Sequence, residues 1–69
     1  MTYHLTAWPL LLRDNPDEAR RRIREALTTT GGNVEAAARE LIVSSHLLWR
    51  YIRALEMRAE IERIRALAP

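Results

Sequence analysis

The stretch TGGNVEAAARELIVSSHLLWRYIRAL, residues 30–55, contains two short amphipathic patterns with an abrupt connection between them. Each pattern begins with a good N-cap residue, Asn33 for residues 33–41 and Ser44 for residues 44–55. The apolar residues that follow recur at spacings of three and four, as on one side of a helix. They are Val34, Ala37, Ala38, Leu41, Leu48, Tyr51, Ile52 and Leu55. Residues 30–55 therefore predict a helix-turn-helix.

The second predicted helix has a polar side opposite its apolar side. At about 100° per residue, His46, Trp49, Arg50 and Arg53 fall within about 100° of arc on that polar side. In a helix-turn-helix the second helix lies in the DNA major groove, where arginine pairs bidentately with guanine and serines at the helix start donate to phosphates. We therefore predict a duplex DNA-binding surface formed by Ser44, Ser45, His46, Trp49, Arg50 and Arg53.

Two members of this surface have an alternative interpretation that involves no DNA. Trp49 is either a residue that packs on sugar-phosphate or a thymine methyl group, or one half-buried at a subunit contact. A single exposed histidine such as His46 is more often solvated than bound to a base or phosphate. The sequence leaves both alternatives open.

A further helix is expected before this stretch, over residues 16–30. Asn15 is a suitable N-cap, Pro16 fits the first helical position, and Glu18 stands where a capping box needs it. Gly31 and Gly32 are expected to end this helix. Its arginines are either a solvated face or contacts to phosphate.

The sequence leaves open the conformation and packing of the two flanking segments, residues 1–15 and 57–67. In the N-terminal arm, residues 1–15, Tyr3, Leu5 and Ala7 alternate as in a strand, while Pro9 could open a helical turn. Its apolar side chains, Trp8 among them, pack either on this chain or on a partner. In residues 57–67 the apolar stripe points roughly opposite to that of residues 44–55. Either the chain bends near Glu56, or this segment packs on a second subunit.

Length and composition narrow the class of protein. A chain of 69 residues forms one small domain of marginal stability, which favours oligomerisation. It has no cysteine, its two histidines lack companions at ligand spacing, and no catalytic triad or phosphate loop is present. We expect no enzyme activity, metal or cofactor. The apolar run of residues 7–12 is too short to span a membrane, and a cytoplasmic location is expected.

The net charge is +2, and all 11 basic residues are arginine. Segment by segment, the excess lies in residues 16–30, at +1 from four arginines against three carboxylates, and in residues 44–55, at +2. The second of these segments is the one expected to contact DNA.

About half of the chain, residues 26–57, resembles the helix-turn-helix of the Fis family, which is also the DNA-binding region of many bacterial enhancer-binding activators. The matching residues are Ala26, Leu27, Gly31, Gly32, Asn33, Val34, Ala37, Ala38, Arg39, Leu41, Val43, Ser44, Leu48, Trp49, Arg50, Ile52 and Leu55. The resemblance implies bacterial transcription regulation or nucleoid organisation, and Trp49 occupies the family's aromatic position.

Two positions depart from the family pattern. The family usually has glycine where this chain has Ile42, and often again where it has Glu56. A β-branched residue at positive φ is an outlier, so we expect Ile42 to pack into the core in an ordinary conformation. At Glu56 the lost glycine favours a helix that runs on into residues 57–67.

The sequence as a whole predicts a small all-α domain of three or four helices with a Fis-like helix-turn-helix. It is expected to bind double-stranded DNA as a homodimer at the nucleoid. The alternative is a protein-interaction or oligomerisation module without direct DNA binding. In that case Trp8, Leu10–Leu12, Trp49, Met57, Ile61 and Ile64 form the surface for a partner chain.

Overall fold

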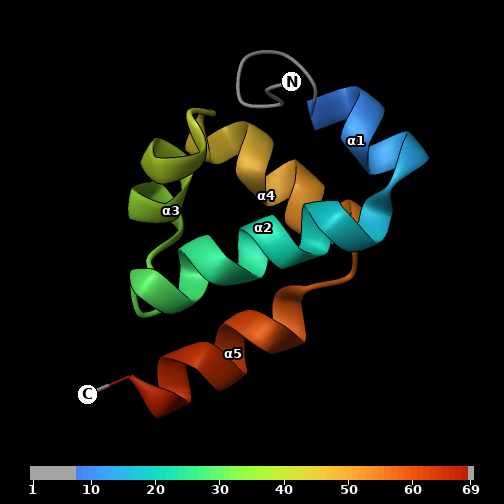
Figure 1. Cartoon of the computed structure of the whole chain (residues 1–69). Coiled ribbons are helices and arrows are strands. Elements are labelled where there is room, and N and C mark those ends of the chain that lie inside the picture. Colours follow the sequence, from blue (N-terminus) through green and yellow to red (C-terminus); the bar gives the residue numbers. More distant parts are fainter. Residues whose placement is uncertain (1–7, 69) are drawn as a thin grey trace.

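A computed structural model describes residues 8–68, which contain five helices and no strand (Figure 1). The predicted all-α class is confirmed, but the described chain has one helix more than the three or four expected. The additional helix is formed within the N-terminal arm. The helices are α1 (Trp8–Asp14), α2 (Pro16–Thr29), α3 (Val34–Leu41), α4 (Ser45–Ala54) and α5 (Arg58–Leu67).

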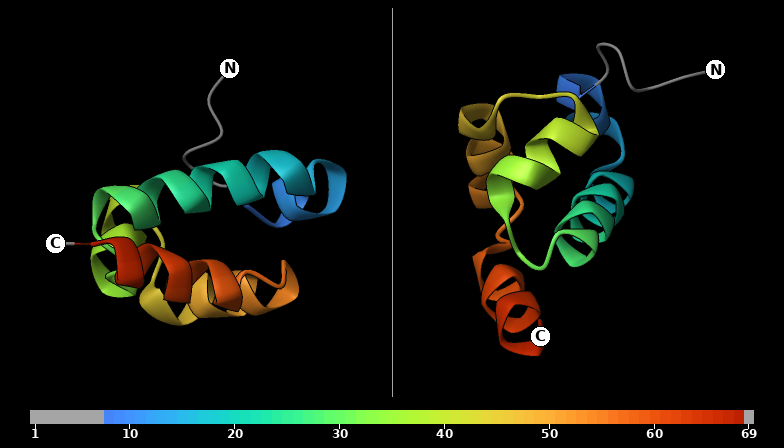
Figure 2. Two further views of the ribbon diagram at one scale, coloured as in Figure 1. Left: turned by 90° about the horizontal axis from the view of Figure 1, so that it is seen from below. Right: turned by 90° about the vertical axis from the view of Figure 1, so that its left-hand side faces the viewer.

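The longest helix, α2, is the centre of the packing. It contacts α1, α3 and α5, while α3 also contacts α4. In the views of Figure 2, α5 runs along α2, and α3 lies between α2 and α4. The side chains between the helices form one continuous hydrophobic core. Its fully buried large members are Ile23, Leu27, Leu48, Ile52 and Met57.

The N-terminal helix α1 packs on the core of its own chain. Trp8 and Leu11 are buried, and the Trp8 ring stacks on that of Tyr51 from α4 with centroids 5.7 Å apart. Pro9 lies in the first turn, where a missing backbone N–H costs no hydrogen bond. The described part of the arm therefore packs intramolecularly. The possible strand at Tyr3, Leu5 and Ala7 lies outside the described residues.

Three helices begin at a side-chain cap in the place that the sequence indicates. The side-chain oxygens of Asn15, Asn33 and Ser44 accept hydrogen bonds from the backbone N–H three residues ahead, at 3.1–3.2 Å. The capping box predicted at Glu18 is wrong, however. The Asn15 N–H donates to the Leu11 carbonyl at 2.8 Å, and the Glu18 carboxylate is held by arginines.

The same helices, α2, α3 and α4, share one type of C-terminus. Each is followed, one or two residues after its end, by a residue of positive φ, respectively Gly31, Ile42 and Glu56. In each, this residue and the one after it donate backbone hydrogen bonds to carbonyls three and five residues before them. This is the Schellman motif, which occupies carbonyls that the helix leaves free.

The expectation that Ile42 packs into the core in an ordinary conformation is wrong. Ile42 has φ 59° and ψ 46°, and the residue is 67% exposed. The left-handed conformation costs an L-residue about 1–2 kcal/mol. The two Schellman hydrogen bonds, from Ile42 to Arg39 and from Val43 to Ala38, hold it there. Position 42 therefore stores backbone strain with little burial in return.

Ile42→Gly is expected to raise the free energy of unfolding by about 1 kcal/mol. Glycine removes the steric cost of positive φ, while its greater freedom in the unfolded chain offsets part of the gain. Urea unfolding followed by circular dichroism measures the change. Ile42→Ala is the matched control, because it removes the exposed side chain and keeps the Cβ. A loss of about 2 kcal/mol with glycine would instead mean that the side chain packs in the fold.

The expected run of α4 into the C-terminal segment is also wrong, and the chain bends at Glu56. Glu56 has φ 58°, and the next residue, Met57, is completely buried. This bend brings α5 beside α2, where Ile61 joins the same core. The apolar stripe of residues 57–67 therefore packs on its own chain. It points roughly opposite to the stripe of residues 44–55 along the sequence, and the turn at Glu56 reorients it toward the same core.

Candidate nucleic-acid interface

Helix α4 separates its apolar and polar side chains as the spacing predicts. Leu48 and Ile52 are completely buried against the core. His46, Arg50 and Arg53 are exposed on the opposite side of the helix. Trp49 lies at the border of the two sides with 36% of its side chain exposed. The structure thus brings these four predicted residues onto one side of α4, with the indole at its edge.

Ser44 and Ser45 lie at the start of α4, beside this surface. The Ser44 hydroxyl oxygen accepts the Leu47 N–H at 3.1 Å, so its own proton is left to donate outward. Ser44 is exposed, and Ser45 is partly buried. Ser44 therefore fixes the helix start and still offers a donor there.

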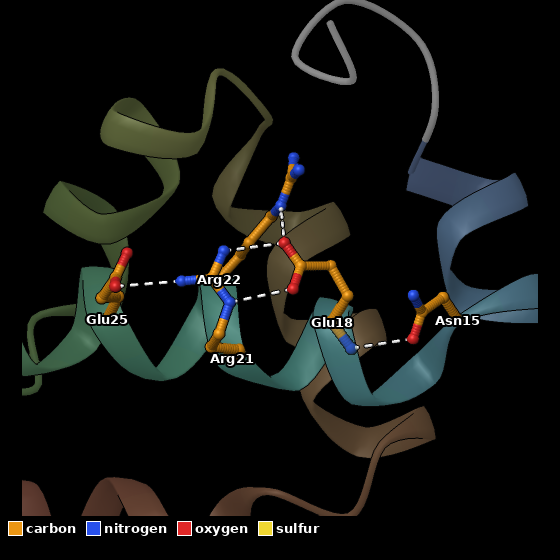
Figure 3. A network of polar contacts seen from close by, with 5 residues as sticks. All are labelled: Asn15, Glu18, Arg21, Arg22 and Glu25. Carbon is orange, nitrogen blue, oxygen red and sulfur yellow. Dashed lines mark hydrogen bonds and ion pairs between the residues drawn. The ribbon is translucent and has the colours of Figure 1, made fainter. Parts of the chain in front are cut away.

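Helix α2 holds its arginines in a network of carboxylates (Figure 3). Glu18 accepts from Arg21 at 2.7 Å and from Arg22 at 2.8 Å, and Arg21 also contacts Glu25 at 3.1 Å. These hydrogen bonds to Arg21 and Arg22 lower the pKa of Glu18 to about 2. The Glu18 carboxylate is therefore ionised at neutral pH, and the two carboxylates of the network lie against its two guanidiniums.

The two remaining arginines of α2 hold neighbouring elements. Arg24 pairs with Glu60 of α5 at 2.6 Å, and this hydrogen bond lowers the pKa of the Glu60 carboxyl. Arg20 pairs with Asp17 at 3.1 Å and donates to the Leu55 carbonyl at the end of α4. All four arginines of α2 thus form ion pairs within the molecule, which favours neither a merely solvated face nor phosphate contact and gives them a structural role.

The arginines of α4 are different. Within residues 8–68, neither Arg50 nor Arg53 forms an ion pair, although six such pairs are present elsewhere in that part of the chain. No acidic residue lies in the first turn of α4 either. The exposed side of α4 therefore keeps its positive charge available to an external anion.

The sequence-based prediction missed one residue beside this surface. Arg58, in the first turn of α5, lines a shallow hollow together with Trp49 and Arg53. A second hollow, between the Gly31–Gly32 turn and Arg65, also borders Trp49. No local pattern in the sequence indicated Arg58, because its place beside Trp49 depends on the left-handed turn at Glu56.

Comparisons with known proteins leave the chain without a match, since no protein family, no curated protein and no solved structure matches it. Over residues 8–68, no helix combines the length and apolar character that crossing a bilayer requires. The same residues contain no group of three histidine, cysteine or acidic side chains placed to hold a metal ion.

Proposed function

We propose that this protein binds duplex DNA, with α4 in the major groove. The observation that carries the proposal is the contrast between the arginines of α2, which carboxylates neutralise, and Arg50 and Arg53, which have no ion pair among the described residues. An exposed positive side on the second helix of a close helix pair is what major-groove binding requires. The role would lie in transcription regulation or nucleoid organisation, and the place in the cytoplasm.

The backbone adds support to the resemblance to the Fis family. The two positions at which that family usually or often has glycine are Ile42 and Glu56. In the described chain these are the two non-glycine residues with positive φ. The α3–α4 turn thus has a backbone that suits glycine, although its side chain is that of isoleucine.

Each predicted site residue has a place in this proposal. Arg50 and Arg53 contact guanine edges or phosphates, and Trp49 packs against sugar or a thymine methyl group. Ser44 and Ser45 donate to a phosphate near the positive end of α4, together with its free backbone N–H groups. His46, exposed in the first turn of α4, contacts a base or a phosphate.

Duplex DNA binding measured across a salt series tests the proposal. We expect fluorescence anisotropy to show binding at low salt, with affinity that falls as salt rises. The slope of log K against log salt should be about −0.9 for each phosphate neutralised. Absence of binding at low salt would contradict the proposal.

We further propose that the protein is a homodimer. The surface predicted for a partner is mostly internal, because Trp8, Leu11, Met57 and Ile61 are buried in their own chain. Outside that predicted surface, Leu67 is 85% exposed and lines an apolar hollow together with Thr28, Thr29, Gly31, Ile64 and Ala68. A projecting leucine next to a hollow suits a two-fold contact, in which each copy fills the hollow of the other.

The dimer is tested by sedimentation equilibrium of the wild type and of Leu67→Ser. We expect the wild type to associate and Leu67→Ser to shift toward the monomer, because burial of the leucine stabilises the contact. Leu10→Ser, at another exposed leucine, is the control and should leave association unchanged. A wild type that is monomeric at high micromolar concentration would contradict the proposal. A dimer without DNA binding would support an oligomerisation module instead.

A further inference from the structure

The hollow lined by Trp49, Arg53 and Arg58 joins the end of α4 to the start of α5. Two of its three lining side chains are guanidinium groups, and neither forms an ion pair among residues 8–68. The third is an indole whose exposed fraction is 36%. A pair of uncompensated guanidiniums beside an aromatic ring is suited to a phosphodiester, whose oxygens take the charge while the sugar packs on the ring.

The place of Arg58 in its own helix strengthens this interpretation. It is the first residue of α5, where the helix dipole disfavours a positive charge. The residue before it supplies no side-chain cap, and Glu60, the acidic residue of that turn, is paired with Arg24. The positive charge of Arg58 is thus unfavourable at its place in α5, and no ion pair among residues 8–68 compensates for it. Such departures from local preference are expected at functional positions.

The backbone explains how Arg58 reaches the surface of α4. The left-handed residue Glu56 lies just beyond the end of α4, and the next residue, Met57, is buried. Arg58 therefore follows Arg53 after a single tight turn. Arg65, later in α5, donates instead to the Gly32 carbonyl at 3.1 Å, which holds the other part of the helix against the α2–α3 turn.

We propose that this hollow is a binding site for a backbone phosphodiester of duplex DNA, with Arg58 as a contact contributed by α5. The site extends the DNA-binding surface beyond α4 and rests on the proposed function. Arg53 belongs both to the exposed side of α4 and to the hollow. The bound phosphate therefore lies beside the groove that α4 enters. Arg58 anchors the backbone and reads no sequence.

The test compares Arg58→Ala with Arg63→Ala in anisotropy titrations on one duplex over a salt series. Both residues are exposed on α5, but Arg63 does not line the hollow, so the two variants lose the same charge at different places. Arg58→Ala should weaken binding about tenfold and reduce the salt slope by about 0.9. Arg63→Ala should retain the wild-type slope, and Arg58→Lys should restore most of the slope lost with alanine.

The outcomes separate the two proposals. If the wild type binds DNA and Arg58→Ala has the wild-type slope, the phosphate site is wrong and the proposed function stands. Equal losses in Arg58→Ala and Arg63→Ala would also overturn the site, because they would indicate a diffuse charge effect. A wild type that does not bind duplex DNA overturns both proposals. Circular dichroism of the variants confirms that α5 remains folded.

Discussion

Trp8→Ala is expected to destabilise the domain by about 3–5 kcal/mol, the range for truncation of a large buried aromatic side chain. Only 6% of the Trp8 surface is exposed to solvent, and its ring stacks on that of Tyr51 at an interplanar angle of 17°. A domain of this length has roughly 3–10 kcal/mol of total stability. The substitution is therefore expected to leave much of the protein unfolded at room temperature, as urea titration followed by circular dichroism will show.

Leu10→Ala is the matched control for this change. Leu10 belongs to the same short helix, but 53% of its side chain is exposed, so its truncation should alter stability by no more than about 0.5 kcal/mol. Comparable stabilities of Trp8→Ala and Leu10→Ala would contradict intramolecular packing of α1. If α1 instead served as an arm for a partner, Trp8→Ala would change the association constant and leave monomer stability nearly intact.

The elements that the sequence predicts well are those set by neighbours in the chain. Asn15, Asn33 and Ser44 cap their helices because each cap needs only the residues of the next turn. The polar side of α4 follows from spacing along a single helix. Local patterns therefore predicted the start of α2, α3 and α4 and the common side of His46, Arg50 and Arg53.

What the sequence did not predict depends on contacts between distant residues. Propensity argues against positive φ at Ile42 and Glu56. Glu56 adopts positive φ because the left-handed turn places Met57 in the same core as Ile52. The Met57 N–H also donates a hydrogen bond to the Ile52 carbonyl at 2.9 Å. Burial in the assembled core offsets the local cost. Arg58 was missed for the same reason, since its place beside Trp49 depends on that turn.

The charge pattern shows a similar limit. Counting charges by segment gives an excess on both α2 and α4, with no means to rank them. The structure distinguishes them through side-chain pairing, including the Arg24–Glu60 pair, whose members are 36 residues apart. Whether a guanidinium is paired is thus a property of the fold. It distinguishes α2, whose four arginines form ion pairs, from α4, whose two arginines form none among residues 8–68.

Replacement of both Arg50 and Arg53 by alanine is expected to weaken duplex DNA binding by about 100-fold or more at low salt. Each guanidinium makes a charge-assisted contact worth about 1.5–3 kcal/mol, and the two contacts are lost together. Fold stability should change by no more than about 0.5 kcal/mol, because both residues are exposed and have no ion pair among residues 8–68. Anisotropy titration and urea unfolding measure the two effects separately.

The double variant Arg13→Ala/Arg63→Ala is the control, since it removes the same charge from exposed positions off α4. It is expected to retain most of the affinity, whereas a simple dependence on net charge would make the two double variants equal. The single variants then assign the contacts. Loss of a phosphate contact weakens all sequences alike and lowers the salt slope by about 1, while loss of a guanine contact relaxes specificity at one base pair. Unchanged binding of Arg50→Ala/Arg53→Ala would remove α4 from the interface, because its other exposed side chains carry too little positive charge to hold DNA alone.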